Sequence, residues 1–471
     1  MDMQNIETEE IISKLIQRAK KAQSVLETFT QQQVDRLAAA ITYEIVTDEK
    51  LIDELSEFSF AECRLGDVLS KKIKLREKCR GVYYDVKYAK TVGIVEEMPE
   101  KGLVRIAKPV GVIGSLVPST QAEMHPIIQA IFAVKARDSI IFSPHPRGKR
   151  TTKKTVDLIR QVMKKYGGPE DAFIAIEEPS VPLTQELMKQ CDLVMATGGQ
   201  PMVRAAYSSG TPAYGVGAGN AIIYIDSSAD LEDAAKKIIA SKVFDLSAGC
   251  SCDNSLIIDK AVYQQMLGHL SAVGFQLLDE QDKQKLRKAI WPQWPENHVI
   301  NRDVVASVLE NIGKIAGIAV LEGKKAFMVE ETLTGEASPF SGEKMCLALS
   351  VYASQSVEDA VRIINENHAY SGAGHSCGVF AKDQEVVDIV ALGTYTTRVV
   401  VNQSQSATNT GNWNNGMSFT SSLGCGTWGG NIVSENICLK HYMNNTWVIR
   451  EIPYFKPSDD QLFSGFTPIQ G

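Results

Sequence analysis

The sequence predicts an α/β protein of more than one domain. From Val110 onward, short apolar runs typical of strands alternate with loops and helical patterns, which indicates parallel sheets covered by helices. A chain of 471 residues exceeds one small core and suggests two or three domains. With 44% apolar and 22% charged residues, the composition is that of an ordinary globular protein with a large interior.

Composition and charge exclude several classes of protein. No apolar run reaches the roughly eighteen residues that a membrane span requires, so we expect no membrane partner. The first residues are acidic and polar, unlike a secretory signal, and the nine cysteines are irregularly spaced. Both features predict a reducing, cytoplasmic setting. A net charge of −7 argues against nucleic acid as a partner.

The first half of the chain begins with helices and continues with an arm and a sheet. Helical spacing of apolar residues predicts a helical cap over 7–60. Strand-like runs at 91–96 and 102–107, separated by a turn at 99–102, predict a projecting hairpin. The α/β alternation then predicts strands at 111–117, 139–142 and 193–196 and helices at 126–137 and 152–166.

A second α/β unit is predicted after Cys250. Its expected elements are helices at 261–270, 302–316 and 357–365 and strands at 346–352 and 398–402. Segment 403–430 is rich in Asn, Ser, Thr and Gly, which predicts a long polar loop and a candidate binding surface. The last strand-like run, 446–452, either joins the earlier hairpin or pairs with another subunit.

A loop of small residues, 247–249, presents Cys250 shortly before the apolar run 256–258. Small neighbours leave a thiol reachable, and the thiolate is the nucleophilic form of cysteine. A buried structural cysteine is the alternative interpretation. Cys250 and Cys252 form only a CxC pair, with no second pair and no nearby histidine at zinc spacing, so we expect no metal site.

Two further features suit an anionic ligand. The basic segment 144–154 follows the strand-like run 139–143, although a solvated helix start explains it equally well. The glycine turn 197–199 leads into a helix start, where free backbone N–H groups can meet a phosphate. A turn from strand to helix also requires glycines for geometry alone.

A set of short motifs extends through most of the chain: 106–111 (IAKPVG), 141–147 (IFSPHPR), 196–199 (ATGG), 205–210 (AAYSSG), 215–220 (GVGAGN), 374–375 (GH) and 423–431 (LGCGTWGGN), together with Cys250 in its loop. In these motifs the chain resembles the aldehyde dehydrogenase superfamily, and within it the coenzyme A-acylating branch, from about residue 8 to 455.

The resemblance implies a Rossmann-like cofactor domain at 1–236, an α/β catalytic domain at 237–430 and a β oligomerisation arm with a C-terminal tail at 431–471. The hairpin at 90–108 is expected in the same arm. A homodimer or homotetramer is the implied assembly.

The resemblance also assigns roles to individual residues. Cys250 is the implied nucleophile, and the Gln121 carboxamide stands where family members commonly have the asparagine of the oxyanion hole. Glu343 matches the glutamate near the nicotinamide ribose, although an exposed carboxylate at a helix edge fits it too. His375 is interpreted as structural. The implied residues for binding NAD or NADP are Ser143, Pro144, His145, Pro146, Arg147, Thr197, Gly198, Gly199, Gly215, Gly217 and Glu343.

The acceptor of the acyl group is predicted from Gly215. Hydrolytic members of the superfamily use a glutamate at this position to activate water, and glycine cannot act as a base. Thiolysis by coenzyme A has less need of that base, because its thiol ionises slightly near neutral pH. A hydrolytic semialdehyde dehydrogenase and a non-catalytic binding protein on the same fold are the alternatives, and the retained Cys250 argues against the second.

The substrate is predicted from the polar loop at 402–420. Its pattern is similar to that of acylating sulfoacetaldehyde dehydrogenases, which implies sulfoacetaldehyde as substrate ahead of succinate semialdehyde and acetaldehyde. The loop has more amides and hydroxyls than an acetaldehyde pocket requires, so Gln405, Asn415 and Thr420 are the candidate donors to an anionic tail. A surface loop that is polar only because it is exposed is the alternative.

Overall fold

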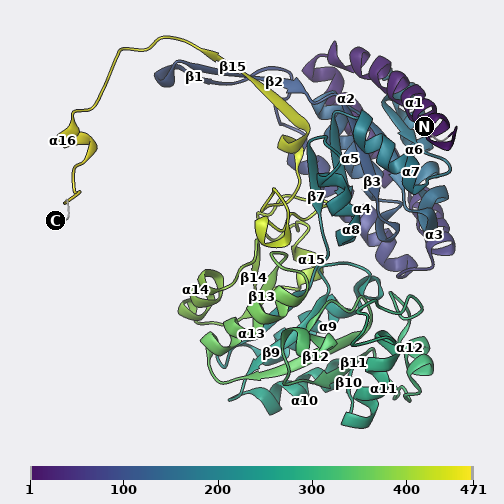
Figure 1. Cartoon of the computed structure of the whole chain (residues 1–471), viewed down its shortest axis with the longest axis vertical. Coiled ribbons are helices and arrows are strands. Elements are labelled where there is room, and N and C mark those ends of the chain that lie inside the picture. Colours follow the sequence, from purple (N-terminus) through teal and green to yellow (C-terminus); the bar gives the residue numbers. More distant parts are fainter. Residues whose placement is uncertain (1–2, 468–471) are drawn as a thin grey trace.

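The computed structural model describes residues 3–467, which form two α/β units and a projecting arm (Figure 1). The first unit is coloured purple to blue-green, the second teal to green, and the chain ends in a yellow arm that extends away from both. Both units contain a parallel sheet with helices packed on it, so the predicted fold class is confirmed.

The first unit contains a five-stranded parallel sheet in the order β5-β4-β3-β6-β7. Its strands are β3 (Val112–Val117), β4 (Ser139–Pro144), β5 (Phe173–Ala175), β6 (Leu193–Thr197) and β7 (Ala213–Val216). Its helices are α1 (Met3–Glu27), α2 (Gln31–Val46), α3 (Glu49–Cys63), α4 (Val68–Val86), α5 (His125–Ala136), α6 (Lys149–Lys165), α7 (Val181–Gln190) and α8 (Gln200–Tyr207). Every residue of β3 and β4 is buried, because helices cover both faces of the sheet.

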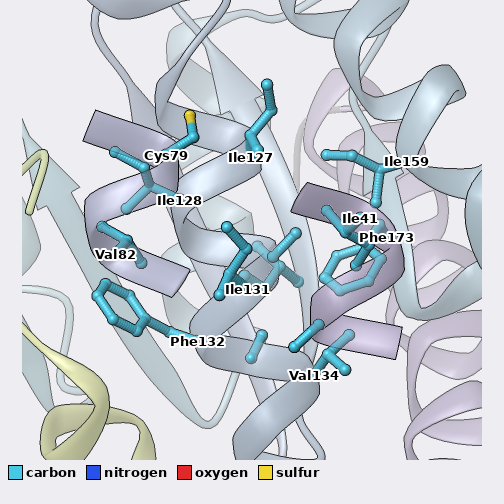
Figure 2. Close-up of a cluster of buried hydrophobic side chains, with 14 of the residues drawn as sticks. Ile41, Cys79, Val82, Ile127, Ile128, Ile131, Phe132, Val134, Ile159 and Phe173 are labelled. Atoms are coloured by element: carbon cyan, nitrogen blue, oxygen red, sulfur yellow. The ribbon is translucent and has the colours of Figure 1, made fainter. Parts of the chain in front are cut away.

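Helix α4 is fixed by its apolar face. Cys79 and Val82 lie in one core cluster with Ile128 and Phe132 of α5 and with Ile41 of α2 (Figure 2). Burial of these side chains leaves little freedom for α4 to rotate, because interiors are closely packed. The polar residues of the helix are therefore held on defined faces.

The second unit contains a seven-stranded parallel sheet in the order β10-β11-β12-β9-β8-β13-β14. Its strands are β8 (Ala221–Ile225), β9 (Asp253–Asp259), β10 (Phe275–Leu277), β11 (Ala326–Glu330), β12 (Ala348–Ser354), β13 (Cys377–Phe380) and β14 (Val399–Val401). Its helices are α9 (Leu231–Val243), α10 (Tyr263–Val273), α11 (Glu280–Ile290), α12 (Leu309–Ala316), α13 (Val357–Tyr370), α14 (Gln384–Gly393) and α15 (Gln405–Thr408).

Two predicted boundaries differ from the structure. The helix expected over 302–316 begins only at Leu309. Ala306 has a positive φ of 48°, and its backbone is engaged with Gly66 and Met345, so the segment before α12 cannot be helical. The chain also enters the second sheet at β8, ahead of the domain boundary predicted at residue 236, because β8 pairs with β9 and β13.

The arm is a three-stranded antiparallel sheet in the order β1-β2-β15. Its strands are β1 (Gly93–Met98), β2 (Leu103–Pro109) and β15 (Met443–Ile449), and a short helix, α16 (Asp459–Leu462), follows. The predicted hairpin is therefore confirmed, and the last strand joins it within the same chain. Among residues 3–467, no helix combines the length and apolar character needed to cross a membrane.

Candidate active site

Cys250 lies in a tight turn between η5 (Phe244–Ser247) and β9. Residues 245–247 have positive φ values of 49°, 50° and 62° in succession, a strained conformation for residues other than glycine. The side chain of Asp245 holds the turn, since its carboxylate accepts hydrogen bonds from Asp67 N–H at 3.0 Å and from Lys74 Nζ at 2.7 Å. The position of Cys250 thus depends on contacts with the first unit.

His375 lies directly against this cysteine. The Nε2 atom of His375 is 3.2 Å from Cys250 Sγ, and Nδ1 is 2.9 Å from Ser376 Oγ. Asn409 donates to Ser376 Oγ at 3.1 Å and packs against Gln405, with 3.4 Å between the two amides. A line of hydrogen bonds therefore orients the imidazole. His375, which the sequence led us to interpret as structural, thus contacts the candidate nucleophile with its ring.

Both members of this pair are uncharged at rest. Burial, followed by the negative charge of Glu343, raises the pKa of Cys250 to about 12. Burial, followed by the nearby Arg398 guanidinium, holds the pKa of His375 well below its usual value. A neutral imidazole can accept the thiol proton when the sulfur attacks a carbonyl carbon.

A small cavity of about 60 Å³ opens beside the sulfur. Its lining includes Lys74, Lys78, Gln121, Cys250, Ser251, Thr410, Thr420 and Ser421. The Oε1 atom of Gln121 is buried without a hydrogen-bond partner, so its amide is available to a ligand. Cys252 is buried, and its thiol points to the carbonyl of Phe244 at 3.7 Å.

The three predicted substrate donors, Gln405, Asn415 and Thr420, lie in different surroundings. Gln405 does not line the cavity, because its buried amide donates to Asp253 at 3.1 Å and supports Asn409. Asn415 is also outside the lining. Its Oδ1 accepts from Met417 N–H at 2.9 Å, whereas its Nδ2 is buried with no hydrogen-bond partner among the described residues. Thr420 lines the cavity, but its hydroxyl donates to the carbonyl of Ile437 at 2.6 Å.

The residues predicted to bind the cofactor gather at the carboxyl ends of β4 and β6, next to α8. Open space lies beside Gly198 and Gly199, where an added Cβ would meet no atom closer than 3.6 Å. Gly199 precedes α8, in which Pro201 has no N–H and the N–H groups of Met202 and Val203 donate to the Gly199 carbonyl. The N–H groups of Gly199 and Gln200 are therefore the ones left to meet a phosphate. Thr197 Oγ1 is 2.8 Å from Ser422 Oγ. These residues fit a dinucleotide.

Some polar groups of the neighbouring segment Ser143–Arg147 already form hydrogen bonds within the protein. Ser143 Oγ is 2.7 Å from Thr184 Oγ1 of α7, and His145 Nδ1 accepts a hydrogen bond from Arg147 N–H at 3.1 Å. Pro144 ends β4, and Pro146 starts the turn η3 (Pro146–Gly148). The segment therefore forms a rigid edge beside the glycine turn.

Gly215 lies in β7 of the first sheet, Gly217 follows this strand, and Glu343 precedes β12 of the second sheet. A Cβ on Gly215 would be 2.8 Å from Val203 and 2.9 Å from Tyr207, so the space beside this glycine is filled. The N–H of Gly217 hydrogen-bonds the sulfur of Cys425. Burial raises the pKa of Glu343 to about 8, although the N–H of Gly219 bonds its carboxylate. Glu343 is half-buried rather than an exposed carboxylate at a helix edge.

Two cationic residues of the cavity, Lys74 and Lys78, are not predictable from a sequence motif. Both lie on α4, far from Cys250 in sequence, and no motif marks them. Their spacing of four residues, which places both on one helix face, was the only available signal.

Comparison with known proteins identifies the fold. The model of the aldehyde dehydrogenase family matches residues 2–421. The chain belongs to this family. A sulfoacetaldehyde dehydrogenase from Acholeplasma sp is 40% identical over 457 residues, 97% of this chain and 94% of the relative. A succinate-semialdehyde dehydrogenase (acetylating) from Clostridium kluyveri is 35% identical over 445 residues, 94% of this chain and 96% of the relative.

A solved structure agrees with these relatives. The acetylating aldehyde dehydrogenase of Geobacillus thermoglucosidasius matches with a TM-score of 0.91 at 31% identity, over 97% of this chain and 100% of that one. This aldehyde dehydrogenase is therefore an oxidoreductase, and the resemblance to the acylating branch that its motifs indicated is confirmed.

Proposed function

We propose that this enzyme converts a short aldehyde, coenzyme A and NAD(P)⁺ into an acyl-CoA, NAD(P)H and a proton. The observation that carries the proposal is the 3.2 Å contact between Cys250 Sγ and His375 Nε2 beside the cavity. Position 215, where hydrolytic members of the superfamily have the water-activating glutamate, is a glycine. A solved propionaldehyde dehydrogenase from Rhodopseudomonas palustris, which contains bound CoA and an acylated cysteine, has the same fold.

The chain's own residues account for the bond changes. Cys250 Sγ bonds to the carbonyl carbon while the thiol proton passes to His375 Nε2. We expect the Gln121 amide and the backbone N–H of Cys250 to donate hydrogen bonds to the developing oxyanion. The 197–199 turn and α8 would hold a nicotinamide dinucleotide, which when bound would supply the oxidant as a hydride acceptor for this carbon. The coenzyme A thiol then displaces Cys250, and the sulfur regains a proton.

Sulfoacetaldehyde is the proposed substrate. Relatives named for it are 40% and 38% identical over nearly the whole chain. Succinate semialdehyde, which also carries an anionic tail, is the second candidate, because the Clostridium kluyveri relative is named for it. Both candidates are small, which suits a cavity far below the roughly 300–1,000 Å³ of drug-sized pockets.

The test is a cofactor-reduction assay with sulfoacetaldehyde, succinate semialdehyde and acetaldehyde, with and without coenzyme A. We expect product formation to depend on coenzyme A and the thioester to be trapped as a hydroxamate. Cys250→Ala should abolish turnover, whereas Cys252→Ala should keep at least about a tenth of it, because the Cys252 thiol points away from the imidazole. Free acid formed without coenzyme A at a comparable rate would contradict the proposal.

A further inference from the structure

Helix α4 presents two ammonium groups to the cavity beside Cys250, and their surroundings differ. Lys74 Nζ lies 2.7 Å from Asp245 Oδ2 and 3.7 Å from Glu123 Oε1, so two carboxylates neutralise it. A charge that is paired in this way does not attract a further anion strongly. Lys74 therefore belongs to the scaffold that holds the turn of the nucleophile.

Lys78, one helical turn further along, has no such compensation. Its Nζ donates to the backbone carbonyls of Ala407 at 2.9 Å and Gly411 at 2.6 Å. In the part of the chain that the structure describes, no carboxylate forms an ion pair with Lys78. The nearby Glu77 accepts a hydrogen bond from the indole of Trp413 at 2.8 Å. Lys78 thus brings an unneutralised positive charge to the cavity lining.

The geometry of Lys78 leaves one donor free. An ammonium group has three N–H bonds, and the two carbonyls use two of them. Those carbonyls also fix the position of Nζ, so a ligand need not pay the rotamer entropy of ordering a long side chain. The third N–H is therefore available, already oriented, to an acceptor in the cavity.

Hydroxyl groups accompany this charge. Ser251 Oγ is buried without any hydrogen-bond partner among the described residues, and Ser251 itself is only 5% exposed. Thr410 and Ser421 also line the cavity. Buried polar groups are normally satisfied, so an orphaned hydroxyl beside an unpaired ammonium points to an absent polar ligand.

We propose that Lys78 is the anchor for the anionic tail of the aldehyde, with the hydroxyls of Ser251, Thr410 and Ser421 as neutral donors around it. This inference rests on the proposed function and names its specificity determinant. The carbonyl end of the substrate then lies at Cys250 and Gln121. A sulfonate offers three acceptor oxygens and a permanent charge, which matches one ammonium and several hydroxyls.

The test compares Lys78→Met with Lys72→Met. Both substitutions remove a lysine from α4, but Lys72 pairs with Asp53 at 2.8 Å and does not line the cavity. Lys78→Met should lower kcat/KM for sulfoacetaldehyde at least about thirtyfold, mainly through KM, because it removes one partner of a partly buried charge pair. Acetaldehyde should change less than about threefold, because it carries no tail for Lys78 to bind. Lys72→Met should leave both substrates near wild type.

A second measurement does not require turnover. Ethanesulfonate should protect Cys250 of the wild-type enzyme from alkylation by iodoacetamide, whereas ethyl methyl sulfone, a neutral molecule of similar shape, should not. Lys78→Met should abolish this protection. The measurement remains informative if the enzyme proves not to use coenzyme A, and the wild-type comparison remains informative if the variant does not fold.

Three results would overturn the inference. Equal losses for sulfoacetaldehyde and acetaldehyde would make Lys78 a structural clamp on the 407–411 segment. A raised KM for coenzyme A alone would assign the charge to the co-substrate. Equal protection by the sulfonate and the sulfone would show that binding at the site does not depend on the negative charge of the ligand. A loss that affects succinate semialdehyde as strongly as sulfoacetaldehyde would support an anionic tail of either kind.

Discussion

At the scale of single residues, the central feature is a neutral thiol and a neutral imidazole in contact. Because burial moves the two pKa values away from each other, proton transfer at rest is unfavourable. The transfer becomes favourable only as the sulfur gains its bond to carbon. This arrangement slows unproductive reactions of the half-buried cysteine before an aldehyde enters the cavity.

The first prediction concerns His375. His375→Ala should lower kcat by about 10²–10⁴, the usual range for loss of a general base, while the affinity for the cofactor stays unchanged. The measurement is steady-state kinetics together with cofactor titration. His269→Ala on α10, which removes a histidine outside the cavity lining, is the control. An unchanged kcat in His375→Ala would restore the structural interpretation of this residue.

The second prediction concerns pH and Lys78. Burial lowers the pKa of Lys78 to about 8, and the opposing influence of Glu77 is smaller. The other charges that face the cavity, Lys74 and Asp245, are paired with each other. The ammonium is therefore present below about pH 8 and lost above it.

Since a sulfonate stays ionised throughout this range, its kcat/KM relative to that of acetaldehyde should fall as the pH rises through about 8. The ratio removes the titration of Cys250 and coenzyme A, which both substrates share. Lys78→Met should give a flat ratio. A wild-type ratio that stays constant from pH 6.5 to 9.5 would contradict the assignment.

At the scale of elements, the sequence predicts the long apolar strands well and the short ones poorly. Runs such as 111–117 and 139–142 are buried on both faces and carry a strong signal, whereas β5 and β10 have only three residues each and were not predicted. The equally short β14 was predicted within 398–402. The turn that presents Cys250 was predicted from its small residues. Its partner His375 is 125 positions away in sequence, so only the parallel pairing of the sheet reveals the contact.

The third prediction concerns the turn of the nucleophile. A Cβ on Gly219 would lie 2.2 Å from the carbonyl oxygen of Cys250, a contact with backbone that cannot give way easily. Gly219→Ala should therefore displace the turn and lower kcat by about a hundredfold, because a shift near 1 Å is enough for such a loss. Single-turnover kinetics and the rate of Cys250 alkylation measure the effect.

The matched control is Gly268→Ala on α10, where an added Cβ would meet no atom within 4 Å. Alanine is favoured over glycine in an exposed helix by up to about 1 kcal/mol, so this variant should melt no lower than wild type and keep full activity. Equal activity of the two variants would show that Gly219 does not constrain Cys250.

At the scale of the whole molecule, the site is assembled from both units. The nucleophile and its imidazole come from the second unit, whereas Lys74, Lys78 and Gln121 come from the first. The carboxyl ends of β4 and β6 face the same crevice, where ligands of open parallel sheets usually bind. The sequence motifs contain the residues predicted to bind the cofactor, but α4 carries no motif. Its two lysines can be assigned to the site only from the way the two units pack together.

The last prediction concerns the arm. Strand β15 lies at the edge of the three-stranded sheet, and the segment that follows it extends away from both units (Figure 1). In this segment Tyr454, Phe455 and Phe466 are exposed by 90%, 78% and 69%. Unpaired edges and clustered apolar side chains are normally covered in a folded assembly, and the resemblance implies that a second copy covers them.

A chain ending at Ile449 should therefore form an assembly of fewer chains than the full-length protein does, while Cys250 keeps its reactivity toward iodoacetamide. Light scattering coupled to size-exclusion chromatography at matched concentrations measures the change. A chain ending at Phe466, which keeps these aromatic residues, is the control and should assemble like the full chain. A full-length chain of monomeric mass would show that the exposed segment has another role.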